Sequence, residues 1–269
     1  MRQKTPHLKW MLTCVLSSAF ISFIPAAQAQ TGASDNNGWH FELTPYLWAT
    51  SQDGTIGLDK GPGNGVPLNQ SFSDILQRMD MSGMALFDVR KERWGLLLDA
   101  IYLKISDRGQ ISGPKGFVTL SAHGDVTQKL FSAAGYYRAI EGKTNLDMVL
   151  GLRYHAVEWD VNANLSLPPV IPSVSRRFNE RKSWTDPFAG VRLIHKIDEH
   201  WSVMGYGDVG GSGSGSDLTW QAIGGVNYSF ASNMVGKLGY RHISYDYHRD
   251  GFKYDVDTSG FYVGLGFTW

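Results

Sequence analysis

Three glycines have the spacing of a nucleotide-binding loop. Gly205, Gly207 and Gly210 form a G-x-G-x-x-G pattern in GYGDVGGSGSGSDLTW, which in dinucleotide-binding folds admits a pyrophosphate at the N-terminus of a following helix. Here the glycines precede a glycine and serine run, 211–215, and then an alternating segment from Leu218. No helix is predicted, so we interpret the run as a flexible external turn and expect no cofactor.

A second group of residues could form an electrostatic network. Acidic and basic side chains recur on the polar face of several alternating segments, which would face the lumen of a barrel. Guanidinium groups and carboxylates of this kind form bidentate ion pairs. The network would either fill the lumen, line a narrow solute path or support catalysis, and we favour filling. The predicted lumen-lining set is Asp88, Arg90, Asp99, Arg138, Arg153, His155, Asp186, Arg192, Asp208 and Arg241.

Evidence for catalysis or metal binding is weaker. His155 follows Arg153 on one face of a segment that also carries Asp147, but no serine is placed to act as its nucleophile. His123, His242 and His248 lie near predicted loops, singly and without metal-ligand spacing. We therefore predict neither an enzyme nor a metal site.

The elements that would position these side chains are strands. Residues 146–156 alternate between an apolar face and a face with Arg153 and His155, and 218–230 repeat the pattern. A period of two with one uniformly apolar face is typical of a strand between two media. Candidate strands lie near 39–50, 81–91, 93–106, 118–139, 144–161, 183–197, 200–210, 217–230, 233–247 and 254–269.

The connections between these strands alternate in length. Those near 91–92, 141–143, 198–199 and 231–232 are tight, whereas those near 51–80, 107–117, 162–182, 211–216 and 248–253 are longer. Outer-membrane barrels have this wiring, with tight periplasmic turns and longer external loops. We predict an all-β transmembrane antiparallel up-and-down barrel of ten strands, or twelve if 55–58 and 66–68 form a further hairpin. A secreted β-sandwich or lipocalin-like barrel is the alternative.

One segment has helical rather than strand periodicity. Phe72, Ile75, Leu76 and Met79 are spaced as on one face of a helix, and Ser71 with Asp74 resembles a capping box. We predict one short helix in the first long connection, where it would enter or cover the barrel mouth.

Both ends of the chain predict export to the outer membrane of a Gram-negative bacterium. Residues 1–29 combine basic residues, an apolar run and Ala27-Gln28-Ala29, as in a cleaved signal peptide, which leaves 30–269 as the barrel domain. The only cysteine, Cys14, lies in the predicted signal peptide, so the mature chain would have no thiol.

The last strand is predicted to carry an assembly signal. Tyr262, Gly264, Phe267 and Trp269 follow the alternating pattern that ends in an aromatic residue, and such a strand resembles the signal read by the barrel assembly machinery. That machinery and periplasmic chaperones are therefore expected partners during biogenesis.

Charge limits the other partners. The chain has 25 basic and 25 acidic residues, and loss of Arg2, Lys4 and Lys9 would leave it slightly acidic. This balance argues against a nucleic-acid partner. The expected surroundings are outer-membrane lipids and lipopolysaccharide.

Several motifs carry a family resemblance. They include Pro45-Tyr46-Leu47-Trp48, Asp186-Pro187-Phe188-Ala189-Gly190-Val191-Arg192, Gly207-Asp208-Val209-Gly210-Gly211, Gly215-Ser216-Asp217-Leu218-Thr219-Trp220-Gln221 and Gly239-Tyr240-Arg241. With them the chain resembles a group of uncharacterised proteobacterial outer-membrane β-barrel proteins. The resemblance implies fold and location rather than activity.

The role predicted from sequence is a structural one in the envelope or a narrow solute passage. Two alternatives from other classes stay open. One is an outer-membrane enzyme that modifies lipid A or phospholipid, and the other is a surface binding or adhesion module presented by the loops near 107–117 and 162–182.

Overall fold

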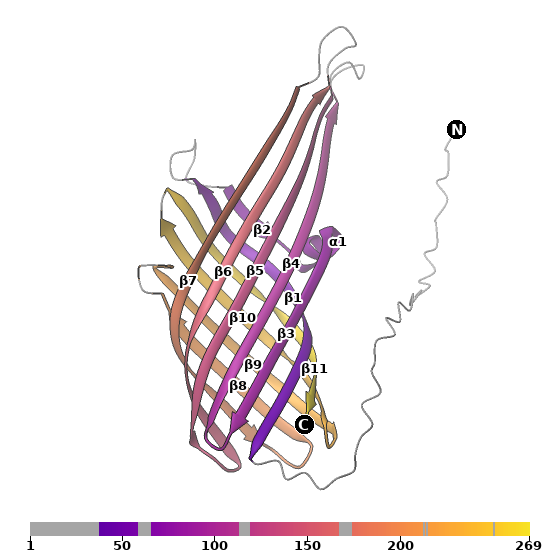
Figure 1. Cartoon of the computed structure of the whole chain (residues 1–269). Helices are drawn as coiled ribbons and strands as arrows, with labels where there is room; N and C mark the ends of the chain where they lie inside the picture. Colours follow the sequence, from indigo (N-terminus) through magenta and orange to yellow (C-terminus); the bar gives the residue numbers. More distant parts are fainter. Residues whose placement is uncertain are drawn as a thin grey trace, which may run out of the picture. The chain divides into compact units, whose positions relative to one another are not determined.

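The structure, a computed structural model, describes residues 38–58, 66–112, 119–166, 174–211, 213, 215–249 and 251–269. The predicted signal peptide lies outside these residues. Within them the chain forms one closed antiparallel sheet (Figure 1). Its strands are β1 (Trp39–Leu58), β2 (Val66–Gln70), β3 (Met79–Lys91), β4 (Trp94–Ser112), β5 (Thr119–Ile140), β6 (Thr144–Ser166), β7 (Val174–Lys196), β8 (Trp201–Gly210), β9 (Leu218–Ala231), β10 (Met234–Arg249) and β11 (Phe252–Thr268).

The barrel is a ring of ten strands. Each neighbour in the order β1, β3, β4 and onward to β11 pairs antiparallel with the next, and β11 returns to pair with β1 from Glu42↔Thr268 to Leu58↔Phe252. The predicted up-and-down barrel is confirmed. The predicted pairing of 55–58 with 66–68 also exists, as β1 with β2. β2 pairs with β1 on the same side as β3 but further along β1, so the count around the ring stays at ten.

On one side of β1, the wall consists of two strands, β3 and β2, with a helix between them. β1 pairs with β3 only as far as Pro45↔Ala85, and pairs with β2 from Gln52 onward. Pro45 has no N–H to donate, which suits the end of a ladder. The helix α1 (Phe72–Arg78) joins β2 to β3 and packs its buried Ile75 on Leu103 and Ile105 of β4. The structure confirms the predicted short helix.

The helix begins with the predicted capping box. The Ser71 side chain accepts a hydrogen bond from the backbone N–H of Asp74 at 3.3 Å, and the Asp74 carboxylate accepts one from the Ser71 N–H at 3.0 Å. The two backbone N–H bonds satisfy donors that a helix N-terminus leaves unpaired. The Ser71 hydroxyl also donates to the Asp74 carboxylate at 2.6 Å, and this bond, together with that from the Ser71 N–H, holds the pKa of Asp74 below its ordinary value.

β4, β6 and β7 extend further than the sequence pattern indicated. β4 reaches Ser112, β6 reaches Ser166 and β7 starts at Val174, and Figure 1 shows β4–β7 rising beyond the other strands. The prediction that 174–182 belong to a loop was wrong, because β7 starts at Val174 and pairs there with Leu165. The extension carries polar residues on exposed faces, such as the ion-paired Asp160 and Arg177, so the alternation that marks a membrane strand is lost there.

The two faces of the barrel have opposite chemistry. Leu47, Leu150 and Phe261 point outward and are 63%, 70% and 66% exposed, whereas Arg153 and Asp147 point inward and are fully buried. Apolar outside and charged inside is the arrangement of a barrel embedded in lipid. Large exposed aromatic residues at the tight-turn end, Trp39, Trp94, Trp201 and Tyr228, suit a membrane interface.

Among the described residues, no helix has the length and apolar character needed to cross a membrane.

Candidate functional site

The candidate site is a chamber inside the barrel, toward the end that carries the tight turns. It has a volume of about 420 Å³ and is lined by inward side chains of the strands of the ring. Lys196 ends β7, Ser202 is the second residue of β8, and Ser229 is near the end of β9. The chamber therefore reaches the tight-turn end of the barrel.

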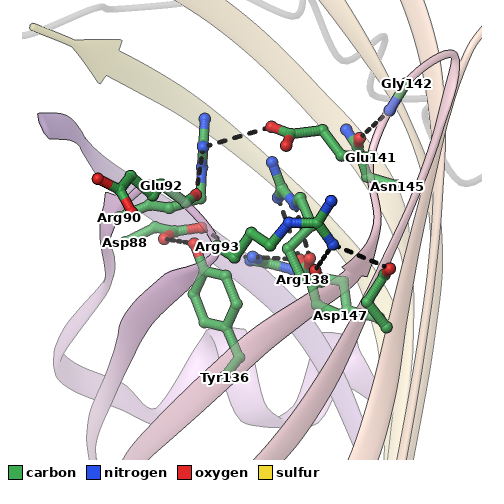
Figure 2. Close-up of polar contacts among 12 residues, drawn as sticks. Asp88, Arg90, Glu92, Arg93, Tyr136, Arg138, Glu141, Gly142, Asn145 and Asp147 are labelled. Atoms are coloured by element: carbon green, nitrogen blue, oxygen red, sulfur yellow. Dashed lines mark hydrogen bonds and ion pairs between the residues drawn. The ribbon is translucent and has the colours of Figure 1, made fainter. Parts of the chain in front are cut away.

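A first charged network lies on one side of the chamber (Figure 2). Asp147 accepts hydrogen bonds from Nε of Arg138 at 2.7 Å and from Nε of Arg192 at 2.9 Å. Nη1 of Arg192 also donates to Asp88 at 2.8 Å, and the Tyr136 hydroxyl donates to the same carboxylate at 2.8 Å. Two carboxylates and two guanidinium groups from four strands thus form one connected cluster.

A second charged network crosses the chamber. Nη1 of Arg241 lies 2.9 Å from an oxygen of Asp99 and donates to the Tyr46 hydroxyl at 2.9 Å. Nε of Arg241 donates to Gln221, whose amide donates to Asp208 at 3.2 Å. Nη2 of Arg153 donates to the same Asp208 oxygen at 2.6 Å. The chain of contacts links β4, β1, β10, β9, β8 and β6.

The strand period explains why residues far apart in sequence meet here. Successive side chains of a strand face opposite sides of the sheet, so Asp147 and Arg153 share the inward face of β6. Burial without a partner is costly for a charge, and each guanidinium in the two networks has a carboxylate partner. Arg153 and Arg241 also lie over aromatic rings, those of Phe188 and Trp48, at 4.6 and 4.8 Å from the ring centres.

Asp186 is an inward residue that does not join either network. Its carboxylate accepts hydrogen bonds from the backbone N–H and the hydroxyl of Ser216 at 2.6 and 2.7 Å. Ser216 follows the glycine and serine run of 211–215 and is fully buried, so the end of this connection is fixed to the wall. A Cβ on Gly215 would lie 2.2 Å from Asp186, which explains the glycine.

An aromatic layer closes the chamber on the side away from the tight turns. We define this aromatic layer as His155, Trp184, Tyr245, Tyr247 and Tyr254, all inward-facing and buried. The ring of His155 is stacked on Tyr245 at 4.7 Å and meets Tyr254 at 5.1 Å, and Trp184 is stacked on Tyr247 at 4.2 Å between ring centres. His155 thus lies among rings, and its Nδ1 has no hydrogen-bond partner in the described chain.

Basic residues surround the outer part of the chamber. Arg90 is 3.8 Å from the exposed Glu141, and Lys237 forms an ion pair with Glu42. Lys196 also lines the chamber, and the described structure gives its ammonium group no ion-pair partner. Arg90 is thus the one predicted lumen residue near the chamber mouth rather than in the buried networks.

The residues of the predicted C-terminal signal occupy both faces of β11. Tyr262 lines the chamber, and a Cβ on Gly264 would lie 3.0 Å from Thr44 and Tyr46. Phe267 faces outward. Trp269 exchanges two backbone hydrogen bonds of 3.1 Å with Phe41, and their rings are stacked 5.9 Å apart. The chain end therefore closes the barrel.

The three histidines that were predicted near loops lie on different parts of the barrel, and for His242 the prediction was wrong, because it lies in the middle of β10. His123 has its Nε2 3.5 Å from Asp125, and His242 packs on Trp220 on the outer face. His248 comes together with Asp217 and Asp246 in an exposed group with ligand atoms within 4.8 Å. Arg249 lies 3.4 Å from Asp217, so a guanidinium group already neighbours this cluster.

Sequence reasoning missed the uncharged members of the networks. Tyr46, Tyr136 and Gln221 bridge the ion pairs but carry no charge that would single them out. Asp147 was noticed only as a neighbour of His155, although it holds two arginines. The available signal was position, since each lies on the inward face of an alternating strand.

Comparisons with known proteins return similar folds and no sequence relative. No family model matches the chain, and no curated protein matches its sequence. Among solved structures, the outer membrane protease OmpT of Escherichia coli is similar at 9% identity with a TM-score of 0.47, covering 89% of this chain and 99% of that one. The translocator domain of autotransporter NalP from Neisseria meningitidis is similar at 13% identity with a TM-score of 0.39, covering 87% of this chain and 89% of that one. The attachment invasion locus protein Ail of Yersinia pestis is similar at 14% identity with a TM-score of 0.33, covering 86% of this chain and 99% of that one.

The activities of these proteins do not transfer to this chain at such identities. The class of protein is defined by the chain's own architecture: a closed transmembrane β-barrel of the outer-membrane type, with a charged lumen.

Proposed function

We propose that this protein is a non-enzymatic outer-membrane barrel that serves as a closed scaffold in the envelope, without a continuous solute path. The observation that carries the proposal is contact between opposite walls. β6 and β11 are separated by four strands of the ring in either direction, yet the rings of His155 and Tyr254 touch across the lumen.

Other side chains occupy most of the cross-section at this level and leave a cavity of only about 40 Å³ beside His155 and Tyr254. Gln52 of β1 and Gln128 of β5 are hydrogen-bonded at 2.9 Å, with β3 and β4 between them in the wall. Trp48, Met84 and Leu130 belong to the same buried cluster as the aromatic layer. A barrel of about ten strands has an interior that side chains can fill. The packing supports a filled lumen over a narrow passage.

The surroundings of His155 also support a role without catalysis. A histidine that activates a nucleophilic side chain needs a hydroxyl or thiol within hydrogen-bond reach and a group that orients its ring. The rings of Trp184, Tyr245 and Tyr254 occupy the positions around His155. Such an environment suits packing better than proton transfer.

Planar-bilayer recordings test the closed scaffold. The purified protein is expected to give no conductance steps across the voltage range if the aromatic layer blocks the lumen as proposed. Steady steps from the unmodified protein would contradict the proposal.

Truncation of side chains in the aromatic layer is expected to open a conducting path, which tests the same proposal with a positive result. Trp184→Ala with Tyr254→Ala removes rings from opposite walls and is expected to produce conductance. The matched control, Phe131→Ala with Phe261→Ala, removes two outward aromatic rings that are 45% and 66% exposed and is expected to stay silent. Both variants are first checked for folding by heat-modifiable gel mobility.

Mass profiles of lipid A and phospholipids test the enzymatic alternative. Cells with and without the protein are expected to give the same profiles. A modification that appears only with the protein would show that a catalytic group has been overlooked.

A second candidate function rests on the extension of β4–β7 beyond the other strands (Figure 1). Arg176, Arg177 and Arg181 are exposed on β7 there, and Asp160 and Glu158 of β6 pair with two of them. A polar sheet raised beyond the wall could present a binding surface. Adhesion of cells expressing the protein, compared with cells expressing a form shortened at paired positions of β6 and β7, tests this role.

A further inference from the structure

The chamber has features that a scaffold does not require. Its volume of about 420 Å³ lies within the range of small-molecule sites in proteins. It reaches the tight-turn end of the barrel and is closed at its other end by Arg241 and the aromatic layer. A barrel stabilised only by packing would gain from filling this space, because empty or water-filled volume forfeits contacts.

The charges around the chamber do not balance. Its lining contains the basic side chains Arg90, Arg138, Arg153, Arg192, Lys196, Lys237 and Arg241. The carboxylates that line it or pair with these groups are Glu42, Asp88, Asp99, Asp147 and Asp208, with Glu141 beside Arg90 at the mouth. Basic groups are therefore in excess, and in a low-dielectric enclosure such an excess attracts anions.

Donors without partners add to this excess. Nε and Nη1 of Arg153 and Nη2 of Arg241 have no hydrogen-bond partner among the described residues, and both side chains are at least nine-tenths buried. Buried N–H groups are normally satisfied by protein or water. At the chamber mouth, the Lys196 ammonium group has no partner in the described chain. An anion in the chamber would complement donors at both ends.

Apolar side chains form a large part of the remaining wall. They include Leu86, Leu97, Phe188, Met204 and Ile223, alongside uncharged polar residues such as Ser132 and Asn227. A ligand that was only a charge would leave these side chains in contact with water. Pockets with mostly apolar walls and a few polar groups bind molecules that have an apolar body and a polar group.

We propose that the chamber binds a small organic anion, which enters from the tight-turn end and places its carboxylate or phosphate group among the basic side chains. The apolar body of the ligand lies against Met204, Phe188 and Ile223. This binding function goes beyond the closed scaffold and does not depend on it, because a closed barrel can bind a ligand from one side.

Calorimetric titration of the protein in zwitterionic detergent micelles tests the proposal. The probes are benzoate, benzyl alcohol, benzylamine and inorganic phosphate, which separate charge sign from apolar character. Benzoate is expected to bind one saturable site at least about tenfold more tightly than each of the other three, since charge-assisted hydrogen bonds to guanidinium groups add to apolar contact. Absence of saturable benzoate binding, or equal binding of benzyl alcohol, would overturn it.

Two pairs of variants locate the binding site. Lys196→Gln removes the unpartnered ammonium group at the mouth and is expected to weaken benzoate binding about threefold to tenfold, a typical effect for one charge-assisted contact. Lys143→Gln makes the same charge change at the same end of the barrel, outside the chamber lining, and should leave affinity unchanged. Equal losses in both variants would show a general surface-charge effect and contradict the site.

The second pair fills the chamber. Met204→Trp with Ile223→Trp places two indoles in the lumen and is expected to abolish benzoate binding. Val203→Trp with Ala222→Trp places them at neighbouring outward positions and should leave binding intact. Heat-modifiable mobility identifies folded protein in every sample. Benzoate binding that survives in the folded inward variant would place the ligand elsewhere and refute the proposal.

Discussion

Buried charge is organised in this barrel around single carboxylates that serve two partners. Asp147 is fully buried and contacts both Arg138 and Arg192. Asp208 similarly accepts from Arg153 and Gln221. Loss of such a carboxylate would leave guanidinium groups without compensation in a space with little water. Breaking a buried pair in this way costs more than the intact pair contributes.

Asp147→Asn is therefore expected to lower the free energy of unfolding by about 3 kcal/mol, because Arg138 would lose its carboxylate and Arg192 one of two. Urea unfolding of the protein in lipid vesicles measures the change. Asp160→Asn is the matched control, since it removes a carboxylate from a more exposed ion pair with Arg177 and is expected to cost no more than about 1 kcal/mol. Similar values for the two variants would mean that the Asp147 cluster is well hydrated.

At the scale of elements, the unusual feature is the wall between β1 and β3. Pairing between them stops at Pro45↔Ala85, and β1 resumes pairing on that side with β2 at Gln52. α1 contacts both β1 and β4 in this region, and Ile75 is its buried side chain, 2% exposed. The helix thus supports a part of the wall where the ladder of backbone hydrogen bonds is incomplete.

Ile75→Ala is expected to loosen α1 locally without unfolding the barrel. Loss of the contacts with Leu103 and Ile105 should speed amide hydrogen exchange in 72–78 by at least about tenfold, in line with a cost of about 2 kcal/mol for a partly relaxed large-to-small change. Exchange in β9 and β10 should not change. Leu76→Ala, at the next position and 53% exposed, is the control, and equal acceleration in both variants would argue against the packing of Ile75 as the cause.

For the whole molecule, closure of the ring depends on the chain end. β11 pairs with β1, and Trp269 completes the seam through its backbone bonds and ring stacking with Phe41. A closed ring leaves no edge strand with unpaired backbone groups in lipid. The last residue therefore joins the first strand to the last and contributes to the stability of the complete barrel.

Deletion of Trp269 is expected to reduce the amount of folded protein in the membrane severalfold, because both the seam and the predicted assembly signal lose their terminal residue. The fraction with heat-modifiable mobility in membrane preparations measures this. Trp94→Ala removes another aromatic residue at the tight-turn end, 68% exposed and packed on Tyr137, and should have a smaller effect. Normal levels of the Trp269 deletion would contradict its role in closure.

The amino-acid sequence by itself determined the barrel, its strand parity and the short helix. It could do so because a strand between lipid and lumen must alternate at every second residue, and a helix start needs a capping pattern such as Ser71 with Asp74. The inward position of Asp88 or Arg241 follows from the same period. These are local constraints, visible without knowledge of which strands face each other.

Only the tertiary structure decided what lies across the lumen. His155 and Tyr254 are almost a hundred residues apart in the sequence. Their contact depends on the diameter of the barrel and on both side chains lying at the same level of the lumen. The extension of β7 to Val174 could not be predicted from the sequence either, because a strand outside the membrane needs no uniformly apolar face and so shows no alternation. The aromatic layer and the chamber beside it arise from packing between opposite walls. Alternation along one strand carries no information about the distance across the lumen between those walls.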